Sequence, residues 1–238
     1  MTSSATGLPH EFDHTHSDVS GGWLRAASFG AMDGLVSNTA LIAGVAAAAN
    51  AHAVILSGIA GLLAGSFSMA LGEYTSVTTA NEQIESEVRL ERRAFRAHPE
   101  AELDELVAML VQMGLSETTA LAAAQEVHQD EAQALNLHMI TELGVDPREK
   151  PSPRVAALSS FLLFAIGAVI PLVPYLLGFE SLVAGIACGA VGLALAGGVS
   201  ARFTGKPVWW ASARQLLFGA VAIAATYLVG ALIGSAVS

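Results

Sequence analysis

Residues 55–96 read ILSGIAGLLAGSFSMALGEYTSVTTANEQIESEVRLERRAFR, and this stretch decides the fold. It begins as an apolar segment, ends as a charged one, and contains no proline. The pattern predicts one long helix, over about residues 53–96, that crosses a membrane and continues into water. Met69 and Glu73 lie in its apolar half, and their spacing of four residues places both on one face.

The composition is that of a membrane protein with one acidic soluble insert. Of the 238 residues, 53% are hydrophobic and 13% are charged, whereas soluble domains carry about a quarter charged residues. Residues 81–150 hold 15 of the 21 acidic and 6 of the 11 basic side chains. Such an acidic insert is a poor partner for nucleic acid and a good one for cations. The single cysteine, Cys188, cannot form an intrachain disulfide.

We predict an all-α membrane protein with five transmembrane helices and a three-helix cytosolic insert between the second and third spans. The predicted parts are a polar His/Asp tail (1–22), the first two spans (23–80), a metal-binding helical domain (81–150) and the last three spans (151–238). The short turn between the first two spans lies near Asn50. The tail has no signal-peptide pattern and is interpreted either as a plain polar segment or as a loose metal-collecting arm.

The insert and the later spans have their own boundary signals. The long helix should end before Pro99, because the residue before a proline avoids helical geometry. A second helix is predicted over about 100–112, and a third runs from an N-cap at Ser116 to Gly144. The remaining spans are predicted at 155–179, with a kink at its prolines, at 181–201 and at 215–238.

The distribution of Lys and Arg predicts the orientation in the membrane. The loops near Asn50 and Gly178 contain neither residue, whereas the insert and the segment with Arg202, Lys206 and Arg214 do. By the positive-inside bias, the N-terminus and the insert face the cytosol and the C-terminus faces away.

Asp33 is a carboxylate inside the first predicted span, where a charge is costly and marks a functional candidate. Small and polar residues share its face, namely Gly30, Gly34, Ser37 and Asn38. If the first two spans pack antiparallel, Met69 and Glu73 lie opposite Asp33, and a thioether favours softer first-row ions such as Fe²⁺. The alternatives are that Asp33 is hydrated near Arg25, that Met69 only packs and that Glu73 is solvated.

Carboxylates and imidazoles recur at helical spacing in the insert. One stripe of the predicted third helix holds His128, Glu131, His138 and Glu142, while Glu102 with Glu105, and Glu87 with Glu91, share faces of the other two helices. Three such helices can converge on a metal cluster, and the alternative is that these are solvated faces. No Glu-x-x-His pair has the spacing of ferritin-like di-iron sites, which argues against a ferroxidase.

The chain resembles the vacuolar iron transporter family from about Trp23 onward. The motifs that carry the resemblance are DGLV (33–36), AGSFSM (64–69), GEY (72–74) and PLVPY (171–175). The resemblance implies five spans, a dimer with its pore between the protomers' first spans, and a three-helix cytosolic metal-binding domain. It also implies export of Fe²⁺ and related ions from the cytosol in exchange for protons.

By position, Asp33 and Met69 look like the pore residues of that family. The residues that look like its domain ligands are Glu91, Glu102, Glu105 and Glu142. The chain departs from the plant members at four positions, which bear on the choice of metal: Gly61 in place of a glutamate, Glu73 in place of a glycine, Ala94 in place of a domain glutamate, and His138 in place of a methionine.

We therefore predict a homodimeric secondary transporter, not an enzyme, that exports Fe²⁺ and also Mn²⁺ in exchange for protons. Fe²⁺ is expected both as cargo and bound to the insert, with Co²⁺ and Zn²⁺ as further candidate ions. The predicted metal ligands are Asp33, Met69, Glu73, Glu91, Glu102, Glu105, His138 and Glu142. The expected location is a bacterial inner membrane or a vacuolar membrane, and the rival functions are a membrane-anchored metal buffer or sensor and a membrane ferroxidase.

Overall fold

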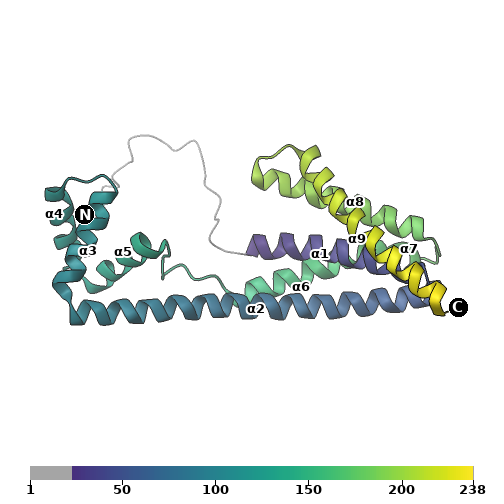
Figure 1. The fold of residues 1–238 in the computed structure, drawn as a ribbon, viewed down its shortest axis with the longest axis horizontal. Helices are drawn as coiled ribbons and strands as arrows, with labels where there is room; N and C mark the ends of the chain where they lie inside the picture. Colours follow the sequence, from purple (N-terminus) through teal and green to yellow (C-terminus); the bar gives the residue numbers. More distant parts are fainter. Residues whose placement is uncertain (1–22, 238) are drawn as a thin grey trace, which may run out of the picture.

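A computed structural model describes residues 23–237, and every regular element in that range is helical (Figure 1). The predicted tail, residues 1–22, lies outside the described residues. The elements in chain order are α1 (Trp23–Ala46), α2 (Ala51–Ala97), α3 (Pro99–Gln112), α4 (Glu117–Val127), α5 (Glu131–Leu143), α6 (Pro153–Val169), η1 (Ile170–Leu172), α7 (Val173–Leu176), α8 (Leu182–Thr204) and α9 (Val208–Val237).

The predicted long helix is confirmed as α2, which has 47 residues. Asn50 caps its start by accepting a hydrogen bond from the backbone N–H of Ala53 at 3.0 Å. His98 ends it, immediately before Pro99 opens α3. At 1.5 Å per residue the helix is roughly 70 Å long, more than twice the hydrocarbon thickness of a bilayer. One rigid element therefore connects the apolar bundle to the insert (Figure 1).

Five helical segments of the described chain are long and apolar enough to cross a membrane, as predicted. The third of these runs through α6, η1 and α7, and the predicted proline kink is the 3₁₀ turn that contains Pro171. The fifth begins at Val208 rather than at the predicted Gln215, because Pro207 precedes the helix and no residue after it interrupts helical geometry.

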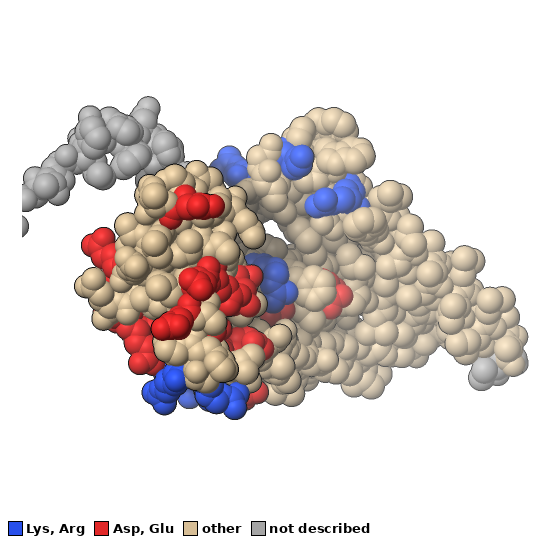
Figure 2. All heavy atoms as spheres, turned by 60° about the vertical axis from the view of Figure 1, so that its left-hand side comes forward, with Lys and Arg blue, Asp and Glu red and all other residues tan. Residues whose placement is uncertain are grey.

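The predicted third helix of the insert is two helices, so that expectation was wrong. Ser116 does cap α4, accepting from the backbone N–H of Thr119, but α4 ends at Val127. Asp130 then starts α5 by accepting from two backbone N–H groups. Gly144 ends α5 in the left-handed conformation, with φ 67°. The helices α3, α4 and α5 lie beside the outer end of α2, where the acidic side chains gather (Figures 1 and 2).

Close contact between helices holds the bundle together. A side chain at Gly34 would collide with the carbonyl oxygen of Phe164 on α6, and one at Gly167 would collide with that of Ala31 on α1. Gly30 also faces α6. These α1 glycines, which the sequence places on the face of Asp33, seat α6 against α1.

Candidate metal sites

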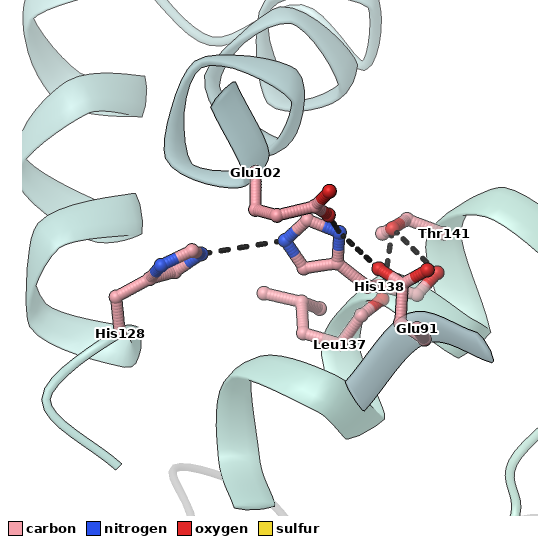
Figure 3. A network of polar contacts seen from close by, with 6 residues as sticks. All are labelled: Glu91, Glu102, His128, Leu137, His138 and Thr141. Carbon is pink, nitrogen blue, oxygen red and sulfur yellow. Dashed lines mark hydrogen bonds and ion pairs between the residues drawn. The ribbon is translucent and has the colours of Figure 1, made fainter. Parts of the chain in front are cut away.

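Three side chains from three helices converge in the insert. Glu91 comes from α2, Glu102 from α3 and His138 from α5, and one ligand atom of each lies within 4.8 Å of the others. The Nδ1 atom of His138 is 3.1 Å from a Glu91 oxygen and 3.9 Å from a Glu102 oxygen. Figure 3 shows both carboxylates directed toward the same edge of the imidazole ring. Carboxylate and imidazole are ligands that divalent first-row metals accept.

The electrostatics of this cluster favour a bound cation. Burial, followed by repulsion from Glu102 and Glu142, raises the pKa of Glu91 to about 7. Burial, and then the neighbouring His128, lowers the pKa of His138 to about 4, so the ring is neutral at pH 7 and its contact with Glu91 is not an ion pair. Among the described residues, the facing atoms Glu91 Oε1 and His138 Nδ1 have no hydrogen-bond partner. A divalent ion would satisfy both.

His128, at the end of α4, orients His138. The Nε2 atoms of the two rings lie 3.3 Å apart (Figure 3). The Phe95 ring packs on both. One of the two nitrogens must carry the proton between them. When His138 carries it on Nε2, its Nδ1 atom keeps a lone pair that faces the two carboxylates. Metal-binding histidines usually donate their other N–H group in this way.

The remaining predicted ligands of the insert lie outside this contact set. Glu105 and Glu142 are exposed, yet burial and the charges of Glu105, Glu102 and Glu87 raise the pKa of Glu142. These carboxylates therefore form an acidic rim around the buried cluster. Glu131, which the sequence placed on the same stripe as His138, lies 3.8 Å from Arg92 on the surface.

A second group of predicted residues lines a cavity among the membrane-spanning helices. Asp33 on α1 and Met69 on α2 both line a pocket of about 370 Å³. Its other lining residues are Ser37, Asn38, Leu41, Gly61, Gly65, Ser68 and Phe164. The antiparallel arrangement of the first two spans thus brings a carboxylate and a thioether to one space, as expected from the sequence.

Glu73 does not line this pocket. It accepts a hydrogen bond at 2.8 Å from Arg25 on α1, and only 7% of its surface is exposed. From the sequence we considered Arg25 only as a neighbour of Asp33. Its ion pair with Glu73 was not predicted. The orienting contact of His128 was also missed, because it depends on the break between α4 and α5. Asp130 was the available signal for this break, because Asp is a residue type that often caps the start of a helix.

Comparisons with known proteins find relatives over most of the chain. A family model described as the VIT family matches residues 24–231. A vacuolar iron transporter from Acanthamoeba castellanii is 33% identical over 216 residues, which cover 89% of this chain and 78% of that protein. Vacuolar iron transporter 1 of Arabidopsis thaliana is 29% identical over 228 residues, covering 92% of this chain and 90% of that protein. Over 78 residues, 32% of this chain and 35% of the relative, the identity to vacuolar iron transporter homolog 4 of Oryza sativa subsp. japonica is 58%.

Proposed function

The chain belongs to the VIT family, and from this premise we propose that it is a proton-coupled exporter of Fe²⁺, with Mn²⁺ as a second substrate. Its relatives are named vacuolar iron transporters, which supports transport of a metal ion through the membrane by a protein that is not an enzyme. The direction of transport, the exchange for protons and the dimeric state are the further content of the proposal.

The observation that carries the proposal is the pocket shared by Asp33 and Met69. A carboxylate among apolar helices offsets the loss of hydration of a divalent cation. The thioether beside it favours Fe²⁺ over harder ions such as Mg²⁺. A membrane-anchored metal buffer or sensor would need the insert but has no use for a carboxylate at this depth.

Proton exchange is supported by the ligand chemistry of both sites. Carboxylates bind metal only when deprotonated, so metal and proton compete for the same oxygen atoms. In the insert, Glu91 has a pKa near 7 and would release a proton when Fe²⁺ binds with Glu102 and His138. We propose that the insert collects metal, with the acidic rim of Glu105 and Glu142 raising the local cation concentration.

A homodimer is supported by polar groups on the outer side of the pocket. Ser37 and Ser68 line it and are exposed in the single chain, although this part of each helix is apolar enough to lie in lipid. A second copy facing the first would cover them and enclose a polar path. The Lys and Arg distribution supports a cytosolic insert, and therefore export away from the cytosol.

The experiment is metal flux in proteoliposomes that contain a metal-quenched dye and carry an imposed pH gradient. The wild-type protein should move Fe²⁺ and Mn²⁺ and move protons the opposite way, whereas Asp33→Asn should abolish flux and leave metal binding by the insert intact. Asn keeps the shape and an oxygen ligand but lacks the charge and the proton site. Flux at the wild-type rate in Asp33→Asn would place the path elsewhere and favour the buffer-or-sensor function.

A further inference from the structure

We propose that the side-chain oxygen of Asn38 is an uncharged metal ligand in the Asp33–Met69 pocket and that it favours harder ions such as Mn²⁺. This inference rests on the proposed transport function. It names a ligand that no motif of the chain indicated, at a position where the sequence suggested only a polar face.

The orientation of the Asn38 amide is fixed by one hydrogen bond. Its Nδ2 donates to the carbonyl oxygen of Ala168 on α6 at 2.6 Å. A backbone carbonyl can only accept, so the amide nitrogen must face Ala168 and the amide oxygen Oδ1 must face away from it. Asn38 is 2% exposed, and within residues 23–237 no group donates a hydrogen bond to Oδ1. A buried acceptor without a partner is rare and calls for an explanation.

The unpartnered oxygen faces Gly61 of α2, a residue that lines the pocket. A Cβ atom built at Gly61 on α2 would lie 3.2 Å from Asn38 Oδ1. Gly61 and Asn38 both line the cavity that holds Asp33 and Met69. Residue 61 has no side chain, so an ion can reach the oxygen once the flexible end of the Leu41 side chain, which also lies beside this position, turns aside.

The three groups form a mixed ligand set. Asp33 supplies a charged oxygen, Met69 a soft sulfur and Asn38 a neutral, hard oxygen. Amide oxygens suit Mn²⁺, Mg²⁺ and Ca²⁺, whereas thioether sulfur suits softer ions. A neutral oxygen also helps to replace lost water without adding charge, so the ion can still leave the site. Asn38 and Met69 should therefore shift the choice of metal in opposite directions.

Two variants test this inference by different means. Asn38→Leu removes the oxygen while keeping a similar volume. Gly61→Ala keeps the amide and its hydrogen bond to Ala168 but places a methyl group in front of the oxygen; the end of the Leu41 side chain must also turn aside. Gly72→Ala is the matched control on the same helix, because a Cβ there meets nothing within 4 Å. Initial rates of Mn²⁺ and Fe²⁺ uptake are measured anaerobically in the same proteoliposomes.

The readout is the ratio of the Mn²⁺ rate to the Fe²⁺ rate, which a purely structural role would not change. We expect this ratio to fall by about tenfold in Asn38→Leu and in Gly61→Ala, and to stay at the wild-type value in Gly72→Ala. Equal loss of both metals, or an unchanged ratio in Gly61→Ala, would overturn the inference while the proposed function stands. Absence of metal flux in the wild-type protein would overturn both. If Asn38→Leu does not fold, the Mn²⁺-to-Fe²⁺ rate ratio of Gly61→Ala alone tests the inference.

Discussion

Arg25 on α1 and Glu73 on α2 lie 48 residues apart in the sequence and form an ion pair at 2.8 Å that joins the two helices. The carboxylate is almost covered, with 9% of its side chain exposed, whereas 63% of the arginine side chain is exposed. A buried charge that loses its partner is more costly than a pair that is removed as a whole. The main role of Glu73 is therefore structural: its ion pair with Arg25 holds α2 against α1.

A double-mutant cycle on Arg25 and Glu73 should give a coupling free energy of about 1 kcal/mol, since the exposed arginine is screened by solvent. Arg25→Met should lower the thermal unfolding temperature in detergent, and adding Glu73→Gln should restore part of it. If the changes in unfolding free energy of the two single variants simply add in the double variant, the two residues are not coupled and this prediction is wrong. Because Glu73 lies outside the pocket, Glu73→Gln should reduce metal flux less than Asp33→Asn does.

Metal binding by the insert should weaken below about pH 7. With ordinary pKa values for its carboxylate ligands, metal binding would begin to weaken only near pH 5. Burial raises the pKa of Glu91 to about 7, so metal must displace a proton below that pH. Affinity should fall by up to about tenfold per pH unit there and level off above about pH 8.

The measurement is Co²⁺ titration calorimetry of full-length Asp33→Asn protein, in which the membrane pocket lacks its carboxylate and the insert is unchanged. Buffers with different ionisation enthalpies count the released protons. Glu91→Gln should bind more weakly and release fewer protons between pH 6 and 7. His138, with a pKa of about 4, is already neutral in that range and contributes no proton. Binding that stays constant from pH 8 to pH 5.5 would show that Glu91 is not a ligand.

His128→Leu should weaken Co²⁺ binding by roughly 10- to 100-fold, as loss of an orienting group around a metal usually does. The reason is the contact of 3.3 Å with His138, which keeps the Nδ1 lone pair directed at Glu91 and Glu102. His128→Gln retains an acceptor and should recover part of the affinity. Equal affinity in His128→Leu and the wild-type protein, by the same calorimetry, would remove His128 from the site.

Burial separates the inner ligands from the acidic rim. Glu102 is 8% exposed and lies in the contact set, whereas Glu105 and Glu142 are exposed. Glu102→Gln should therefore lose most of the Co²⁺ affinity. In the rim variants Glu105→Gln and Glu142→Gln the Co²⁺ affinity should fall only a few-fold, and this reduction should be larger at low salt. Glu131→Gln serves as the control for an exposed carboxylate away from the cluster. If a rim variant bound Co²⁺ as weakly as Glu102→Gln does, that rim residue would also be a metal ligand.

Much of the fold follows from local patterns. The apolar runs predict five spans, and the absence of proline between residues 55 and 96 predicts α2. Asn50, Ser116 and Gly144 act as helix caps where their residue types suggest. The break between α4 and α5 was missed because the helical spacing of His128, Glu131, His138 and Glu142 continues across it, and the cap at Asp130 marks it.

The candidate sites depend on contacts that spacing along one helix cannot give. Met69 and Glu73 share a face of α2, but Arg25 engages Glu73 while Met69 lines the pocket. Glu91, Glu102 and His138 were each predicted as ligands, yet their meeting depends on how three helices cross. The direction of the Asn38 oxygen is set by a carbonyl group 130 residues away. Such partners are fixed by tertiary packing and not by the local sequence.

Met69→Leu should lower the rate of Fe²⁺ uptake in proteoliposomes more than that of Mn²⁺. Leucine keeps the apolar volume in the pocket and removes only the sulfur, a ligand that favours softer ions. The Mn²⁺-to-Fe²⁺ rate ratio should rise by about threefold to tenfold, opposite in sign to the change expected for Asn38→Leu. Met113→Leu, an exposed methionine of the insert, is the control. If Met69→Leu slows both metals equally, Met69 packs the pocket and does not bind the ion.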